Sequence, residues 1–214
     1  MSDYLIYGIG FTAQVLFSAR LLIQWIRSEK AGRVLSPTIF WQLSLIASFI
    51  LLCYGILRDD LAIILGQFIA YFIYIRNLQF KNAWKFIPSY FRVISLAFPF
   101  IAVFWLLSDF SHNIIYIINK EEIPLNVLIW GSAGQVVFTF RFIYQWLYSE
   151  KEAKSVLPIG FWIISLAGSL MIISYAVYRL DPVLLLGQVF GSAIYTRNIF
   201  IHFKVKDSAV KYRA

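Results

Sequence analysis

The chain repeats itself at a fixed offset of 121 residues, and this internal repeat limits the fold more than any other feature. The stretch FSARLLIQWIRSEK from Phe17 matches FTFRFIYQWLYSEK from Phe138. The stretch GQFIAYFIYIRN from Gly66 matches GQVFGSAIYTRN from Gly187. Across residues 14–78 the register needs no gap, and about 25 of 65 positions are identical. Chance agreement would be several-fold lower, so the fold must contain one structural unit twice.

Each copy holds three apolar segments that are long enough to cross a bilayer, which takes about 20 residues apiece. Only 14% of the residues are charged, against about 25% in a soluble domain. We therefore predict an all-α membrane protein with about seven transmembrane helices, in which two parallel three-helix repeats are joined by a linker helix. The predicted segments are 4–26, 38–57, 61–79, 91–107, 123–147, 159–178 and 182–203.

The repeat and these segments together predict the domain organisation. We expect a first repeat over 1–80, a linker with one transmembrane helix over 81–121, a second repeat over 122–203, and a basic cytoplasmic tail over 204–214. Residues 1–19 contain no Lys or Arg, so the positive region of a cleaved signal peptide is missing and we expect the first segment to be retained.

The distribution of Lys and Arg predicts the orientation, because cytoplasmic loops of membrane proteins are enriched in positive charge. Seven crossings would place 14 basic residues on one side and three, Arg58, Lys120 and Arg179, on the other. The predicted N-terminus is therefore periplasmic and the C-terminus cytoplasmic. The 14 basic residues on the cytoplasmic side are Arg27, Lys30, Arg33, Arg76, Lys81, Lys85, Arg92, Lys151, Lys154, Arg197, Lys204, Lys206, Lys211 and Arg213.

Arg20 and its twin Arg141 are the leading candidates for a binding site, since both fall inside predicted transmembrane helices. A buried arginine in a membrane is costly and usually faces a cavity or a partner. Its planar fork of donors suits phosphate. The alternative is that each arginine extends along its own stem to the interface. Gln24 and Gln145 follow four residues later on the same helix face, and we include them in the predicted site.

The third segment of each copy supplies further candidate ligands. Gln67 and Tyr74 match Gln188 and Tyr195, and each pair lies on one face of its predicted helix. These side chains either contact a ligand or form hydrogen bonds between helices, which commonly join membrane bundles. Asn77 and Asn198 close the same helices beside a basic residue. They either contribute to the site or anchor the helix ends at the lipid headgroups.

The sequence favours no catalytic, metal or cofactor site. His112 and His202 lie far apart and lack metal-ligand spacing, and the single cysteine, Cys53, excludes an intramolecular disulfide. The pairs Glu29–Lys30 and Glu150–Lys151 are expected to be solvated in loops. No basic run is interleaved with aromatic residues in a polar domain, so the charge of +8 is assigned to membrane topology and no nucleic-acid partner is expected.

The combined motif resembles a known family. The pattern FSARxxxQWxxSE, then a Pro shortly before FW, a short RxD turn, GQ and IYxRN, is similar to the lipid-A-disaccharide synthase N-terminal domain-like family, and it occurs twice with only the linker outside. The three-helix unit also resembles PQ-loop and SWEET transporters, although the Pro-Gln pair is absent. The family name comes from a domain found ahead of a glycosyltransferase. The resemblance implies a role near lipid A or lipopolysaccharide assembly in a Gram-negative inner membrane, without disaccharide synthesis.

Three functions remain open on this basis. The first is a transporter or flippase of a lipid-linked, polyprenyl-phosphate sugar for lipid A modification, with the arginines on the phosphate and the glutamines and tyrosines on the sugar. The second is a non-catalytic membrane subunit that anchors a glycosyltransferase. The third is a SWEET-like transporter of a small sugar. Expected partners are therefore membrane lipids, a phosphorylated or sugar-bearing lipid, and a glycosyltransferase.

The predicted orientation leads to a labelling test. In a Cys53→Ala background, a cysteine placed at Lys30 and a cysteine placed at Lys151 should both react with a membrane-impermeant maleimide only from the cytoplasmic side. A cysteine at Arg179 should react from the periplasmic side. Labelling of positions 30 and 151 from opposite faces would contradict the parallel arrangement of the two repeats.

Overall fold

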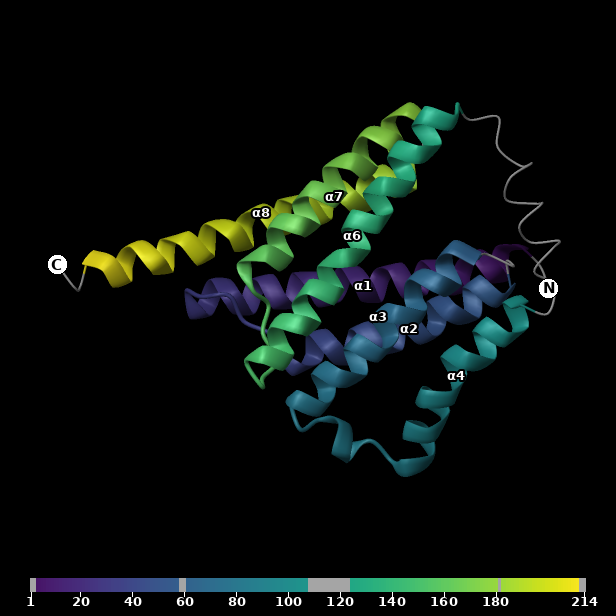
Figure 1. Cartoon of the computed structure of the whole chain (residues 1–214), viewed down its shortest axis with the longest axis horizontal. Helices are drawn as coiled ribbons and strands as arrows, with labels where there is room; N and C mark the ends of the chain where they lie inside the picture. The colour runs from purple at the N-terminus through teal and green to yellow at the C-terminus, as the bar shows by residue number, and fades with distance from the viewer. Residues whose placement is uncertain (1–2, 58–60, 108–123, 181, 212–214) are drawn as a thin grey trace. The chain divides into compact units, whose positions relative to one another are not determined.

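The computed structural model describes residues 3–57, 61–107, 124–180 and 182–211 (Figure 1). Within these residues the chain forms seven α-helices and one short 3-10 helix, η1, and contains no strand. Arg58, His112, Lys120 and Arg213 lie outside the described residues. The elements are α1 (Asp3–Ala31), α2 (Thr38–Leu57), α3 (Leu61–Phe80), η1 (Trp84–Phe86), α4 (Ser89–Leu107), α6 (Leu125–Lys151), α7 (Ile159–Tyr178) and α8 (Pro182–Lys211).

The all-helical class predicted from the sequence is confirmed. Four helical segments among the described residues are long and apolar enough to cross a membrane: Tyr4–Ala31, Thr38–Leu57, Leu125–Lys151 and Ile159–Tyr178. A shorter apolar helix covers Ser89–Trp105. These apolar helices indicate that the protein is associated with a membrane. The predicted arrangement of seven transmembrane helices, with three in each repeat and one in the linker, stays a prediction.

Helices α1 and α6, which lead into charged loops, extend further at their C-terminal ends than predicted. α2 and α7 have the predicted bounds, but α1 continues to Ala31 and α6 to Lys151. The Trp25 indole donates to Glu29 Oε1 at 2.9 Å, and the twin bond from Trp146 to Glu150 Oε1 is 2.8 Å. Bonds between residues four apart support the last turn of a helix. The placement of these two glutamates in solvated loops was therefore wrong, because both belong to helices.

α1 and α6 end in the same backbone turn. Gly32 follows α1 with a φ of 63°, and its twin Ala153 follows α6 with a φ of 51°. The Ala153 amide donates to Glu150 O at 3.1 Å and the Lys154 amide to Ser149 O at 3.2 Å, which is the Schellman pattern of a helix end. The first copy places glycine where the left-handed conformation is required, and the second copy places a side chain there.

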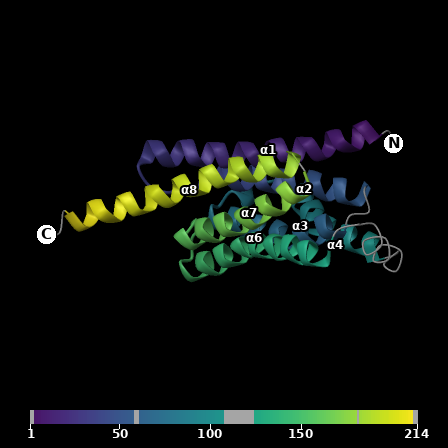
Figure 2. The same ribbon diagram turned by 90° about the horizontal axis from the view of Figure 1, so that it is seen from above.

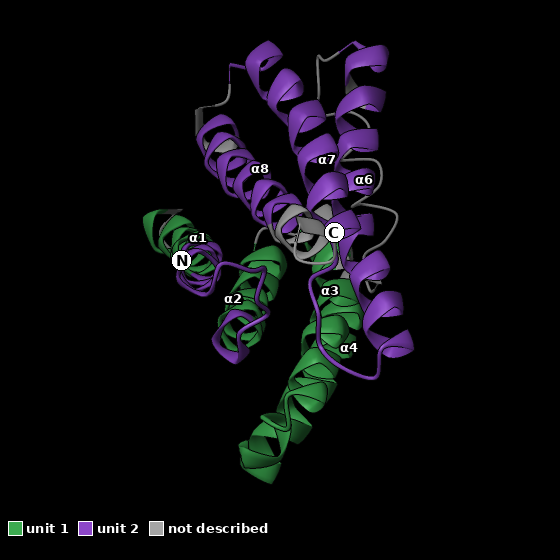
Figure 3. Cartoon of the chain, turned by 90° about the vertical axis from the view of Figure 1, so that its left-hand side faces the viewer, with its two compact units in different colours: residues 1–19, 41–122 green, residues 20–40, 123–214 purple. Residues whose placement is uncertain are grey.

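The described contacts divide the chain into two compact units (Figure 3). Unit 1 contains residues 1–19 and 41–122, and unit 2 contains residues 20–40 and 123–214. The second half of α1 and the loop after it therefore belong to the unit that contains the second repeat. The domain boundaries predicted from the sequence follow the chain order, and they stay a prediction.

Unit 1 is held by aromatic and polar contacts among α2, α3 and α4. The Ser48 hydroxyl of α2 donates to Gln67 Oε1 of α3 at 2.8 Å. The Phe100 ring of α4 lies 5.5 Å from Phe68 of α3, with the planes at 85°. Edge-to-face rings of this kind pack favourably, so α4 is fixed against α3 by its aromatic side chains.

In unit 2, α7 packs against both α6 and α8, and α6 and α7 lie side by side in both views (Figures 1 and 2). At Gly168 of α7 the helix lies close to the backbone of α6, since a Cβ added there would lie 2.7 Å from the backbone nitrogen of Phe138. Small residues allow membrane helices to approach in this way. The close approach brings the side chains of α6 and α7 into one cluster.

The different residues in the two helix-ending turns give a paired prediction. Ala153→Gly should raise the free energy of unfolding by about 1 kcal/mol, because the left-handed conformation costs roughly this amount for a residue with a Cβ. Gly32→Ala should lower it by a similar amount. Chemical unfolding in detergent, followed by circular dichroism, measures both variants. Equal destabilisation by both substitutions would contradict the assignment.

Candidate functional site

The repeated motif Gln-Trp-x-x-Ser-Glu builds a hydrogen-bonded clamp at the end of α1. Gln24 is fully buried, and its Nε2 donates to Ser28 Oγ at 2.9 Å and to the Leu35 carbonyl at 3.2 Å. The Leu35 amide in turn donates to Ser28 Oγ at 3.0 Å. The two side chains therefore hold the loop between α1 and α2 in place by its backbone.

The second copy forms the same clamp at the end of α6. Gln145 Nε2 donates to Ser149 Oγ and to the Val156 carbonyl, both at 2.8 Å. The Val156 amide donates to Ser149 Oγ at 3.2 Å. Because the three residues are the 121-residue counterparts of those in the first clamp, the structure reproduces the repeat at the level of single hydrogen bonds. We call both arrangements the glutamine–serine clamps.

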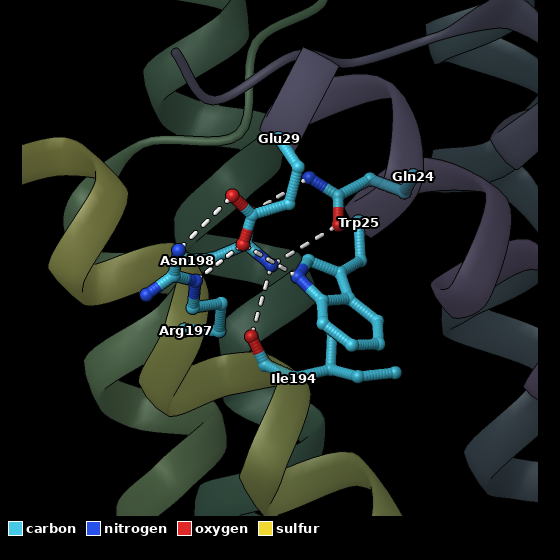
Figure 4. A network of polar contacts seen from close by, with 6 residues as sticks. All are labelled: Gln24, Trp25, Glu29, Ile194, Arg197 and Asn198. Atoms are coloured by element: carbon cyan, nitrogen blue, oxygen red, sulfur yellow. Dashed lines mark hydrogen bonds and ion pairs between the residues drawn. The ribbon is translucent and has the colours of Figure 1, made fainter. Parts of the chain in front are cut away.

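Gln24 also joins the first copy to the second (Figure 4). Its Nε2 donates to Asn198 Oδ1 at 2.8 Å, and Asn198 Nδ2 donates back to Gln24 Oε1 at 3.2 Å and to the Ile194 carbonyl at 2.9 Å. Beside this buried pair, Arg197 donates to Glu29 through both Nε and Nη2, the latter at 3.1 Å. These four side chains form what we call the α1–α8 clasp: Gln24, Glu29, Arg197 and Asn198.

Arg20 and Arg141 lie near each other in unit 2. Both are buried, with 5% and 6% of their surface exposed. The Cζ atoms of Arg20 and Arg141 lie 5.5 and 4.7 Å from the centroid of the same Phe142 ring. The two guanidinium carbons are therefore at most about 10 Å apart, a span that one phosphorylated headgroup could bridge.

Aromatic rings from four helices, α2, α6, α7 and α8, surround the two guanidinium groups. Arg20 lies 5.0 Å from Phe40 of α2, and Arg141 lies 3.3 Å from Phe138, 5.9 Å from Phe161 and 5.9 Å from Tyr195. A cation over an aromatic ring is stabilised by the ring quadrupole, more strongly when water is excluded. We call this group the arginine site: Arg20, Phe40, Phe138, Arg141, Phe142, Phe161 and Tyr195.

The helices of the arginine site contain almost no acidic side chains. The sequence has no Asp or Glu over 4–28, 38–57, 123–149, 159–178 or 182–206. These stretches of the five helices therefore contribute positive charge and no carboxylate. Such a site attracts an anion, and Arg recognises phosphate through its planar set of N–H donors.

The remaining predicted ligands contact neighbouring helices. The Ser169 hydroxyl of α7 lies 2.8 Å from Gln188 Oε1 of α8, which repeats the bond from Ser48 to Gln67 in unit 1. The Tyr74 and Tyr195 rings lie 6.2 and 6.1 Å from the Trp41 and Trp162 rings. These contacts agree with the interpretation as interhelical bonds, and a ligand role for the two glutamines stays a prediction.

The ten predicted site residues thus fall into separate groups. Arg20, Arg141 and Tyr195 come together in the arginine site. Gln24, Gln145 and Asn198 belong to the clamps and the clasp, and Gln188 joins α7 to α8. Three of the ten, Gln67, Tyr74 and Asn77, lie in unit 1, where Asn77 Nδ2 donates to the Ile73 carbonyl at 2.9 Å.

Sequence reasoning missed the aromatic residues that line the arginine site and the serines that complete the clamps. The FW dipeptide that follows each proline carried the signal for Phe40 and Phe161, and the Gln-x-x-x-Ser spacing carried it for Ser28 and Ser149. Within the described part of the chain, no group of three or more His, Cys, Asp or Glu could hold a metal ion.

Comparison with known proteins agrees with the repeat and with the motif. The profile of the Lipid A Biosynthesis N-terminal domain family matches the chain twice, over residues 9–79 and 130–200, so the two matches are themselves 121 residues apart. The chain is also similar to curated lipid-A-disaccharide synthases. That of Chlamydia pneumoniae is 28% identical over 96% of this chain and 35% of the relative. The synthase of Chlamydia muridarum is 27% identical over 79% of this chain and 30% of the relative.

The chain therefore spans about a third of the length of the curated relatives it matches. The resemblance inferred from the repeated motif is confirmed. No solved structure matches the chain, and no PQ-loop or SWEET protein is among the curated relatives reported above.

The α1–α8 clasp predicts that its buried amide pair stabilises the fold more than its ion pair does. Asn198→Ala should lower the free energy of unfolding by about 1–3 kcal/mol, because it leaves buried polar atoms of Gln24 without their partner. Arg197→Ala should have a small effect, because an ion pair with 52% and 33% of its side chains exposed is screened by solvent.

A double-mutant cycle in detergent isolates the amide pair. Gln24→Ala and Asn198→Ala together should cost less than the sum of the two single changes, since each removes the same bonds. Additive effects would show that the two amides are not coupled.

Proposed function

Because the chain belongs to the Lipid A Biosynthesis N-terminal domain family, we propose that it handles a phosphorylated lipid of the lipid A or lipopolysaccharide pathway in a bacterial inner membrane. In this proposal the protein binds a lipid-linked sugar, such as a polyprenyl-phosphate monosaccharide, and moves it across the membrane. The observation that carries the proposal is the arginine site, in which two buried guanidinium groups lie around one phenylalanine ring.

The electrostatics of the arginine site favour a phosphate over a neutral ligand. Removing a guanidinium from water is expensive, and two of them at close range add mutual repulsion. An anion between Arg20 and Arg141 would offset both costs. Hydrogen bonds from Arg to phosphate oxygens are charge-assisted and roughly twice as strong as neutral ones. A small uncharged sugar would offset neither cost, so the SWEET-like alternative is the weakest of the three.

The repeat supports movement of the ligand rather than simple storage. Parallel repeats related by an axis along the membrane normal occur in transporters, with binding sites near the middle of the membrane. Arg20 and Arg141 occupy equivalent positions in the two copies, and each lies four residues before its glutamine–serine clamp. With the N-terminus periplasmic and the C-terminus cytoplasmic, both clamps would close the cytoplasmic ends of their helices.

A second function has its own support. The curated relatives are named synthases, and this chain corresponds to about a third of their length. An equivalent role for this protein is a membrane subunit that binds the lipid substrate and anchors a glycosyltransferase at its basic cytoplasmic face. Co-purification with a glycosyltransferase, together with binding but no movement of lipid, would favour this function.

The transport proposal predicts that the arginine site is required for movement of a lipid-linked sugar. The purified protein in liposomes should accelerate the change in sidedness of a fluorescent polyprenyl-phosphate sugar, measured by quenching from outside. Arg20→Ala combined with Arg141→Ala should reduce that rate at least tenfold. Lys154→Ala is the matched control, because its side chain is 65% exposed and lies outside the site. A rate equal to that of protein-free liposomes would contradict transport.

A further inference from the structure

Trp162 of α7 is a buried tryptophan whose ring packs against two rings of the arginine site. The residue is 0% exposed, and its Nε1 has no hydrogen-bond partner among the described residues. Its ring lies 4.9 Å from Phe161 and 6.1 Å from Tyr195. Both of these rings also lie 5.9 Å from the Cζ atom of Arg141. The indole centroid and that guanidinium carbon are therefore at most about 11 Å apart.

Packing alone does not explain a tryptophan at this position. Buried polar atoms are almost always hydrogen-bonded, and in a bilayer no water is available to take that place. A buried Trp is normally used where its N–H reaches an acceptor. Phenylalanine would supply an aromatic surface against Tyr195 without a buried donor. The donor therefore indicates an acceptor that is not part of the described protein.

The first repeat provides an internal comparison. Trp41 is the twin of Trp162, is also fully buried, and packs on Tyr74 at 6.2 Å with the planes at 40°. The corresponding values for Trp162 and Tyr195 are 6.1 Å and 38°. The two indoles thus pack on their tyrosines in the same way, and Trp41 is assigned to unit 1 whereas Trp162 is assigned to unit 2.

We propose that the indole N–H of Trp162 donates a hydrogen bond to an oxygen atom in the headgroup of a phosphorylated lipid bound between Arg20 and Arg141. This inference rests on the proposed function and adds a neutral third donor to the two guanidinium groups. The guanidinium groups provide affinity for charge. The indole fixes where one oxygen of the headgroup lies, because an N–H donor requires a close and nearly linear acceptor.

Trp162→Phe tests the donor while keeping an aromatic ring. The probe is farnesyl phosphate added to the full-length protein in detergent, with farnesol and inorganic phosphate as the comparison ligands. Trp162→Phe should weaken farnesyl phosphate binding about tenfold, which corresponds to about 1.4 kcal/mol. Trp41→Phe, the same change in the other repeat, should leave the dissociation constant unchanged. Arg20→Ala with Arg141→Ala should abolish binding.

Nuclear magnetic resonance of 15N-labelled indoles gives a readout that a packing role would not move. The Trp162 signal, assigned by its absence in Trp162→Phe, should shift downfield with farnesyl phosphate and stay in place with farnesol. If both Trp→Phe variants have a lower melting temperature but bind farnesyl phosphate with unchanged affinity, and the Trp162 indole signal does not shift, then Trp162 serves packing and the inference is overturned.

The remaining outcomes separate this inference from the proposed function. If the arginine variants abolish binding but Trp162→Phe binds farnesyl phosphate as the wild type does, the inference fails and the proposed function stands. If wild-type protein binds no farnesyl phosphate, the proposed function itself fails. If inorganic phosphate shifts the indole signal and competes as well as the lipid does, the ligand is a free phosphate and the lipid assignment is overturned.

Discussion

The reciprocal amide bonds between Gln24 and Asn198 are the interaction on which unit 2 depends. Each amide both donates and accepts, and both residues are fully buried. Gln24 also holds the loop after α1 through Leu35, so one side chain fixes a helix, a loop and a neighbouring helix together. In an environment without water an unmade bond of this kind is expensive, and the pair therefore specifies which helices can be neighbours.

The arginine site follows from that arrangement. Arg20 lies four residues, about one helical turn, before Gln24, so the clasp that fixes Gln24 also determines where Arg20 is held. The Phe142 ring lies close to both Arg20 and Arg141. Fixed, buried cations resemble the preorganised charge of a binding site, since the cost of desolvation is met during folding and not when the ligand arrives.

The sequence predicted the helices well and the site only in part. The apolar runs that begin just after Pro37 and Pro158 predicted where α2 and α7 start, because proline is favoured at the start of a helix. The extra turns of α1 and α6 are supported by Trp–Glu hydrogen bonds between residues four apart, and this spacing is visible in the sequence. The positions of Phe40, Phe138 and Phe142 around two arginines could not be predicted from the sequence, because they arise from packing between segments far apart in the chain.

The clasp takes one half from each copy of the repeat, since Gln24 comes from the first and Asn198 from the second. A shorter ancestor with a single copy would have had to borrow the opposing asparagine from another molecule. In this chain both residues belong to one molecule, so the local concentration of the partner is set by the connecting chain and not by expression level. The pairing also does not require identical copies, and the two copies differ at Gly32 and Ala153.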